Sequence, residues 1–309
     1  MPLSRRRRTA QRAVPTIWLN LVCLDAPVVA VAWLCLFART FHVSIQIENA
    51  IALFLTAWLI YLADRLADSL LLEPGTPRSA RHAYCLRHRE IWIATVVLVA
   101  GLDSYVIWRG TAIETFFAGA VVGLLAIIYL VLNHPFGRIW RSLPAKELAI
   151  GVLFCAGTMV ALQPHLPLTP DFVLAVIFFA ALCSLNCVSI ASWERDLDRA
   201  QGKVSIATRH PGMVRVAPLC LGLAGVSLVF AFVCRSAAAL FACLSASALL
   251  LGYLNASRSF EAVVATALSR RKHAFVRRQS AVVTTSDQRT ALADLVLLTP
   301  VVALILAAL

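Results

Sequence analysis

Charged residues are scarce in this sequence, and no hydrophilic stretch is long enough to form a separate soluble domain. Only 14% of the 309 residues are charged, whereas 60% are hydrophobic. Soluble globular domains carry about 25% charged residues. The composition therefore argues against an ordinary soluble domain and favours a polytopic membrane protein.

Several motifs with well-defined chemistry are also missing. The nine cysteines include no CxxC pair and no metal-ligand spacing, and all except Cys85 lie in or beside apolar runs. Such cysteines behave as small hydrophobic residues, so we expect no disulfide framework. The sequence has no GxGxxG, no GxxxxGK[ST] and no HExxH, which leaves nucleotide use and zinc proteolysis without support.

Long apolar runs, in contrast, fill most of the chain. A membrane-spanning helix needs about 20 largely apolar residues. Nine runs approach or exceed this length: 16–38, 44–66, 91–108, 113–133, 147–163, 171–192, 216–234, 237–255 and 290–308. We predict an all-α membrane helix bundle of about nine transmembrane helices. It forms one domain, 16–309, after a basic segment, 1–15.

Positive charge is distributed unevenly between the loops. With the N-terminus placed in the cytoplasm, 24 of the 28 Lys and Arg residues fall on the inside, in 1–15 and in the loops 67–90, 134–146, 193–215 and 256–289. Only Arg39, Arg109 and Arg235 fall outside. This asymmetry predicts a multi-pass protein of the cell (inner) membrane with a cytoplasmic N-terminus. Basic residues in short blocks do not favour nucleic acid binding, despite the net charge of +12.

Two acidic clusters close apolar runs on the predicted cytoplasmic side. The first is Asp64-Arg65-Leu66-Ala67-Asp68 and the second is Glu194-Arg195-Asp196-Leu197-Asp198. Carboxylates four residues apart share one face of a helix. Charges at the edge of a membrane are costly unless they are paired, metal-bound or hydrated. A single cluster of this kind favours simple anchoring at the interface, but two clusters on one side favour a shared site for a metal or an anionic ligand.

The side chains in and near these clusters suit a diphosphate site. The carboxylates of Asp64, Asp68, Glu194 and Asp198 are candidate catalytic residues and ligands for Mg²⁺, which prefers oxygen and leaves room for phosphate oxygens. Candidate cations for the diphosphate are Arg65, Arg81, Lys146, Arg199 and Lys203. Candidate cavity residues are Tyr61, Asn186, Ser189 and Asp196, although the two within the membrane are equally explained by helix-to-helix hydrogen bonds. The set is suited to ionising an allylic diphosphate inside an apolar chamber.

Three further acids lie within apolar runs. Asp25 and Asp294 fall near the predicted cytoplasmic face, where they either line the same cavity or pair with loop arginines. Asp103 lies toward the opposite face, and we expect it to be structural.

The two clusters resemble the Asp-rich motifs of the UbiA-type membrane prenyltransferases. The family's first motif reads NDxxDxxxD. Here Asp64-Arg65-Leu66-Ala67-Asp68 matches its second half, and Ile60-Tyr61 stand in place of the leading Asn-Asp. The second motif, DxxxD followed by a basic residue and Gly-Lys, matches Glu194–Asp198 with Arg199, Gly202 and Lys203. The resemblance implies a nine-helix bundle that binds a prenyl diphosphate through Mg²⁺.

The predicted function is therefore an integral membrane prenyltransferase that moves a prenyl group from a prenyl diphosphate to an apolar or aromatic acceptor. Two alternatives remain open. One is a UbiA-type terpene cyclase, in which the same allylic cation is captured within the molecule. The other is a non-catalytic lipid-binding or transport relative with a degenerate site. The sequence does not define the oligomeric state.

Overall fold

The structure is a computed structural model that describes residues 15–72, 75–133, 146–209, 215–269 and 288–308. Within these ranges the chain is helical and contains no β-strand. The α-helices are α1 (Pro15–Leu21), α2 (Asp25–Thr40), α3 (Ile47–Leu70), α4 (Ala80–Arg87), α5 (Arg89–Gly110), α6 (Ile113–Asn133), α8 (Lys146–Val160), α9 (Pro170–Ala200), α10 (Ile206–Arg209), α11 (Val216–Val233), α12 (Ala238–Ser269) and α14 (Thr299–Leu306). Two 3₁₀ turns, η1 (Arg235–Ala237) and η2 (Val296–Leu298), precede α12 and α14.

Seven described helical stretches are long and apolar enough to cross a membrane. They are Ile47–Leu70, Arg89–Gly110, Ile113–Leu132, Pro170–Ala200, Val216–Val233, Arg235–Ser257 and Gln288–Leu306. The prediction of an all-α bundle with many membrane-spanning helices is confirmed at this level. The predicted count is higher because runs 16–38 and 147–163 form shorter helices, with 16 residues in α2 and 15 in α8.

The first predicted run is broken rather than continuous. The chain turns between α1 and α2, where Cys23 adopts a left-handed conformation with φ of 59°. Pro27 explains this break, because within one continuous helix its ring would clash with the carbonyl of Cys23, four residues earlier. In the first turn of α2 the same proline is tolerated, since the amide that it lacks would have no helical partner there.

Other helices continue into regions predicted to be loops. Predicted loop 67–90 starts with the end of α3 and contains α4, and loop 193–215 starts with the end of α9 and contains α10. Loop 256–289 begins with the last residues of α12. The basic segment 1–15, apart from Pro15, and predicted loop 134–146, apart from Lys146, lie outside the described residues.

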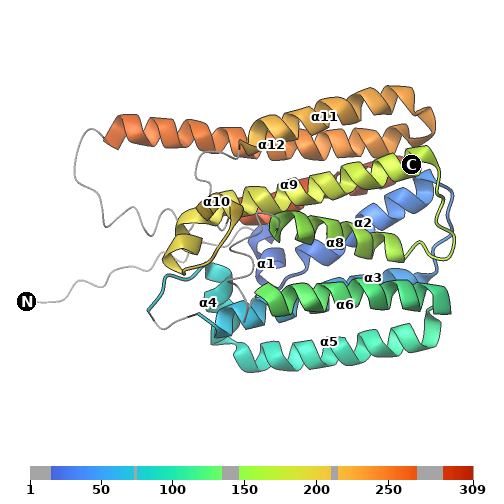
Figure 1. The fold of residues 1–309 in the computed structure, drawn as a ribbon, viewed down its shortest axis with the longest axis horizontal. Coiled ribbons are helices and arrows are strands. Elements are labelled where there is room, and N and C mark those ends of the chain that lie inside the picture. Colours follow the sequence, from blue (N-terminus) through green and yellow to red (C-terminus); the bar gives the residue numbers. More distant parts are fainter. Residues whose placement is uncertain (1–14, 73–74, 134–145, 210–214, 270–287, 309) are drawn as a thin grey trace, which may run out of the picture.

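The long helices run side by side along one axis of an elongated bundle (Figure 1). In this view α11 and α12 lie along one side and α5 along the other, with α2, α8 and α9 between them. Helix α2 joins the bundle together. It packs against α3 and α8, and it also packs against α12 and α14. Its aromatic residues form the centre of the core: the rings of Trp33 and Phe179 stack at 4.6 Å, and Phe37 packs on both Phe172 and Phe179.

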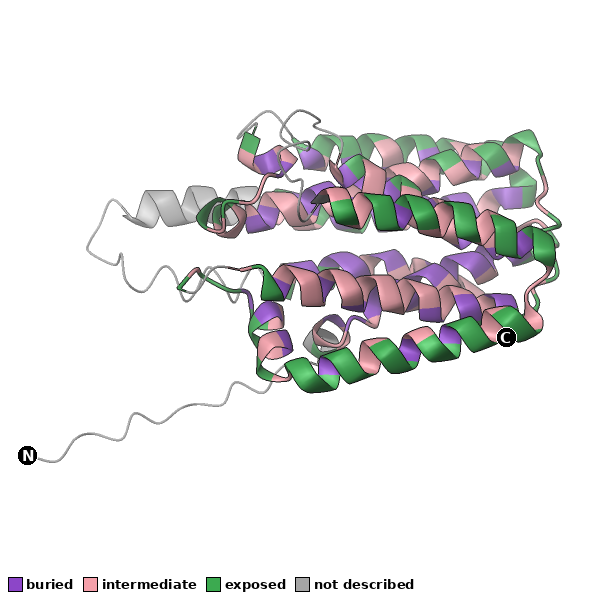
Figure 2. Ribbon diagram, turned by 60° about the horizontal axis from the view of Figure 1, so that its bottom comes forward, coloured by how far each residue is buried: buried purple, intermediate pink, exposed green. Residues whose placement is uncertain are grey.

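The outward surfaces of the bundle are apolar. Buried residues concentrate on the inner helices, while exposed residues line the outer faces (Figure 2). On α5 and α6 the exposed side chains include Val97, Leu98, Trp108, Phe117 and Val121. Large apolar surfaces of this kind mark contact with a membrane or a partner rather than with water. Together with the seven long apolar helices, they indicate a multi-pass membrane protein.

Candidate functional site

A single cavity brings the two acidic clusters together. Its volume is about 560 Å³, and residues of α2, α3, α4, α5, α6, α8 and α9 line it. Cavities of this size bind small molecules in many proteins. The carboxylates of Asp64 and Asp68 on α3 and of Glu194 and Asp198 on α9 all line this cavity. The four predicted catalytic residues therefore share one space, at the end of the bundle where α3 and α9 finish.

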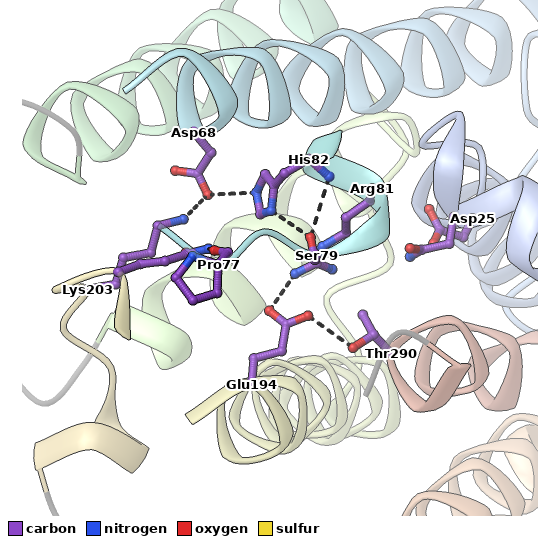
Figure 3. A network of polar contacts seen from close by, with 11 residues as sticks. Asp25, Asp68, Pro77, Ser79, Arg81, His82, Glu194, Lys203 and Thr290 are labelled. Atoms are coloured by element: carbon purple, nitrogen blue, oxygen red, sulfur yellow. Dashed lines mark hydrogen bonds and ion pairs between the residues drawn. The ribbon is translucent and has the colours of Figure 1, made fainter. Parts of the chain in front are cut away.

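Two ion pairs cross this end of the cavity (Figure 3). Lys203, just after α9, contacts the carboxylate of Asp68 on α3 at 2.6 Å. Arg81 on α4, the helix that follows α3, contacts Glu194 on α9 at 2.5 Å. Lys203, which follows the cluster on α9, thus pairs with the cluster on α3, and Arg81, which follows α3, pairs with the cluster on α9. The two ion pairs hold α3, α4 and α9 together.

The chain places Lys203 by a Schellman turn at the end of α9. The amide of Gly202 donates to the carbonyl of Arg199, and the amide of Lys203 donates to the carbonyl of Asp198 at 2.8 Å. Gly202 has a φ of +66°, a left-handed conformation that glycine adopts without steric penalty. The turn reverses the chain, so that the lysine points back toward Asp68.

A capping serine places Arg81 and His82. The Ser79 hydroxyl accepts a hydrogen bond from the amide of His82 and so caps the first turn of α4. It also lies 2.6 Å from Nδ1 of the His82 ring. The other ring nitrogen, Nε2, lies 3.7 Å from the Asp68 carboxylate. A neutral imidazole with its proton on Nε2 satisfies both contacts, because Nδ1 then accepts from the serine hydroxyl.

The His82 ring gives the protein a pH-dependent stability. Burial lowers the pKa of its imidazole to about 4; the positive charges of Arg81, Arg65 and Lys203 act in the same direction, and the contact with Asp68 opposes them. In the unfolded chain the ring takes up a proton below about pH 6.5. The folded state excludes that proton down to about pH 4, so this contribution is present above pH 6.5 and is lost as the pH falls toward 4.

We therefore expect the contribution of His82 to the free energy of unfolding to fall by up to about 3 kcal/mol between pH 6.5 and pH 4. The measurement is thermal unfolding of the protein in detergent micelles across this range. His82→Gln, which keeps polar atoms near Ser79 and Asp68 but does not titrate, should remove most of the slope. An equal slope in both proteins would contradict the assignment.

Several cations at this end have unused hydrogen-bonding capacity. Arg65 is buried and lines the cavity, and its Nη1 has no hydrogen-bond partner among the described residues. The Nε of Arg81 is likewise buried and has no partner within the described part of the chain. Lys146, at the start of α8, and Lys203 also line the cavity. Positive groups with spare donors in a cavity are suited to an anion rich in oxygen atoms.

The remaining predicted site residues on α3 and α9 face the same space. Tyr61 and Asp64 line the cavity. The carboxylate of Asp198 is close enough to Glu194, Lys203 and Lys146 to interact with their charges. Glu147 also lines the cavity; its Oε1 accepts from the amide of Ile206 at 3.0 Å, while its Oε2 is buried without a partner among the residues that the structure describes.

No group of three or more metal-binding side chains occurs among the described residues. The donor chemistry of the four carboxylates suits Mg²⁺. In this arrangement, however, Asp68 holds Lys203, and Glu194 holds Arg81 and accepts from Thr290 at 3.2 Å. The described side chains therefore do not form a ready magnesium site, and the predicted Mg²⁺ cofactor remains a prediction.

Four predicted site residues do not line the cavity. Arg199 is exposed, and Asp196 is exposed and contacts its neighbour Arg195 at 3.4 Å. Because α9 continues to Ala200, Asp196 lies about 200° around the helix from Glu194. Asn186 and Ser189 are buried against other helices: Asn186 donates to Asp294 at 2.9 Å, and Ser189 accepts from Asn255 at 2.9 Å.

Asp25 and Asp294 also lie outside the cavity lining. Asp25 accepts from Asn20 at 2.7 Å, and Asp294 accepts from Asn186. Both carboxyls are buried, and each bonds to an asparagine rather than to an arginine of the loops. Asp103, in contrast, lines the cavity, although the sequence suggested a purely structural role.

Some residues of the site could not be selected from the sequence. Ser79, His82 and Thr290 position the charged groups, and Glu147 lines the cavity. The Pro-Gly turn at 74–75 predicts a break before α4, but nothing in the sequence shows that His82 reaches Asp68. Thr290 is 96 residues from its partner Glu194 in the chain.

Comparisons with protein-family models, with curated proteins and with solved structures find no match to this chain.

Proposed function

We propose that this protein is an integral membrane prenyltransferase with a UbiA-like nine-helix fold, in which α2 and α8 serve as the two short members. It would transfer a prenyl group from a prenyl diphosphate to an apolar or aromatic acceptor. The observation that carries the proposal is the cavity itself. One end combines two acidic clusters with cations that have spare donors, and apolar residues of α3, α6 and α8 line much of the rest.

The diphosphate would bind at the charged end. Arg65 has a buried Nη1 without a partner in the described chain, and Arg81 and Lys203 exchange their carboxylate partners for phosphate oxygens. Hydrogen bonds to a charged group contribute about 1.5–3 kcal/mol each. These cations stabilise negative charge on the diphosphate as the bond between its oxygen and the prenyl carbon breaks.

The apolar part of the cavity would hold the prenyl chain and shield the allylic cation from water. Residues such as Ile60, Leu53 and Phe154 line this part. The acceptor then forms a bond to the prenyl carbon that the diphosphate has left and gives up a proton, which the released diphosphate takes up; prenylated product and protonated diphosphate then leave the cavity. Mg²⁺, the predicted cofactor, would add positive charge at the diphosphate once the ion pairs have opened, and no step above depends on it.

The direct test is diphosphate release by the purified protein in lipid nanodiscs, with geranylgeranyl diphosphate and Mg²⁺ as the first pair of additions. Product analysis without an added acceptor separates transfer from cyclisation, because a cyclic hydrocarbon would form only in a terpene cyclase. Binding of the diphosphate without any release, at every chain length tested, would support the non-catalytic lipid-binding or transport relative and contradict the enzyme.

A further inference from the structure

The far end of the cavity, away from the charged residues, is also polar. The cavity extends along α3 from Asp68 to Asn49. At 1.5 Å per residue these two positions are about 28 Å apart along the helix axis. An apolar prenyl chamber would need no polar group at such a distance, so the residues at this end require their own explanation.

Three buried polar atoms at this end have no hydrogen-bond partner among the described residues. They are Oδ1 of Asn49, Oδ1 of Asp103 and Oγ1 of Thr111, and all three residues line the cavity. The exposed fraction is only 4% for Asn49 and 5% for Asp103. Burying a polar group without a partner is unfavourable, and most buried polar groups in proteins are paired. Three such atoms in one cavity therefore point to a ligand that pairs with them.

The fold holds these residues in place. The other oxygen of Asp103 accepts a hydrogen bond from Thr56 at 2.7 Å, which fixes the carboxyl group between α3 and α5. The Cα of Gly110 packs so closely on the side chain of Glu48 that a Cβ atom would not fit. This close contact places Thr111, at the end of α5, beside Asn49 at the start of α3. Asp103 lies about 12 Å deeper along α5.

The chemistry of the three groups defines the ligand. The carboxylate oxygen accepts hydrogen bonds, the asparagine amide and the threonine hydroxyl accept and donate, and no arginine or lysine lines this end of the cavity among the residues that the structure describes. A second phosphate or carboxylate would therefore be repelled by Asp103. A hydroxyl or an amino group fits, because each donates to the free oxygen atoms.

We propose that Asn49 and Thr111 form a second polar subsite that binds a hydroxyl or amino group at the end of the ligand farthest from the charged residues, and that the carboxylate of Asp103, about 12 Å deeper, favours a positively charged amine. The ligand in this cavity would then be polar at both ends and apolar between them. This inference rests on the proposed function in one respect: it assumes that the substrate binds in this cavity.

The test measures binding rather than turnover, with the full chain in lipid nanodiscs. One pair of probes is hexadecyl phosphate and ω-hydroxyhexadecyl phosphate, which differ only in the terminal hydroxyl; ω-aminohexadecyl phosphate is the third. A second pair, hexadecane and hexadecanol, lacks the phosphate. We expect the hydroxylated member of each pair to bind about tenfold more tightly, as one net hydrogen bond predicts.

Two near-isosteric variants, Asn49→Leu and Thr111→Val, should each reduce this preference by at least about threefold and leave the affinity for hexadecyl phosphate within about twofold. Thr95→Val is the control, since the Thr95 hydroxyl donates to the carbonyl of Ile91 in its own helix and Thr95 does not line the cavity. Asp103→Asn separates the two donors: it should keep the preference for the hydroxyl and lose the preference for the amine.

Equal binding within both pairs by the unmodified protein would overturn the subsite, as would a preference that survives in both variants. The second pair keeps this result separate from the proposed function. If hexadecanol is preferred over hexadecane, this preference is lost in the two variants, and no phosphate binds, the subsite stands and the diphosphate site fails. If none of the five probes binds, both proposals fail.

Discussion

Replacing Asp68 or Asp198 with Ala is expected to reduce diphosphate release from a prenyl diphosphate by about 100-fold or more. Both carboxylates line the cavity, and Asp68 holds Lys203 at 2.6 Å and faces His82 at 3.7 Å. Asp68 positions Lys203, and Asp198 lies near Lys203 and Lys146, so losing either carboxylate should displace cations that stabilise the departing diphosphate; a loss of about 2.7 kcal/mol of that stabilisation corresponds to about 100-fold in rate. The measurement is the initial rate of diphosphate release at saturating prenyl diphosphate.

Asp196→Ala is the matched control, because this aspartate belongs to the same cluster but is exposed and points away from the cavity. Its rate should stay within about twofold of the unmodified protein. Asp68→Asn separates charge from shape, since the amide keeps the size of the side chain but cannot neutralise Lys203. Full turnover in both Asp68→Ala and Asp198→Ala would contradict the assignment of these carboxylates to the reaction.

The periodicity of the helix explains why part of the site could be predicted. Asp64 and Asp68 recur at four residues, as do Glu194 and Asp198, so each pair shares one helical face whatever the neighbouring helices do. Both pairs line the cavity. The distribution of positive charge predicted that the two clusters lie at the same end, and the ion pairs between α3, α4 and α9 agree with that prediction.

Other candidate residues do not line the cavity, because their positions depend on where helices end or pack. Asp196 was grouped with its neighbours in sequence, but α9 continues through the cluster and turns this side chain away. Asn186 and Ser189 lie on the same helix, yet they face Asp294 and Asn255. The sequence contains no information on which helix packs against which face. The break before α2, in contrast, was predictable from Pro27.

The residues at the far end of the cavity could not be predicted from the sequence for the same reason. The three residues come from two helices. Asn49 lies at the start of α3, Asp103 lies within α5, and Thr111 follows the last residue of α5. Each is unremarkable within its own segment, and a lone aspartate in an apolar run is usually assigned a structural role. Only their common position around one cavity makes them a candidate subsite.

The pair formed by Arg81 and Glu194 is expected to give the largest loss of stability. The side chains are only 13% and 10% exposed, so neither charge is well hydrated when its partner is removed. Breaking a buried pair from one side costs about 3–5 kcal/mol. Glu194→Ala also removes the acceptor of the Thr290 hydroxyl, which adds to the effect. We expect the double variant Arg81→Ala with Glu194→Ala to be more stable than Glu194→Ala alone, because it leaves no unpaired charge.

A double-mutant cycle measured by unfolding in detergent micelles tests this expectation. The cycle for Arg81 and Glu194 should give a coupling free energy of about 3 kcal/mol or more, because each single variant leaves a buried charge that the double variant does not. The exposed pair Arg195–Asp196, with side chains 35% and 64% exposed, is the control and should give less than about 0.5 kcal/mol. Additive effects of Arg81→Ala and Glu194→Ala would contradict the pairing.

The same cycle connects stability with ligand binding. If diphosphate takes Arg81 from Glu194 on binding, saturating inorganic diphosphate should lower the coupling free energy of this pair while it raises the unfolding temperature of the unmodified protein. The control pair, which lies outside the cavity, should not respond. A coupling that diphosphate leaves unchanged would mean that the anion does not reach Arg81, and that the ion pair only joins α4 to α9.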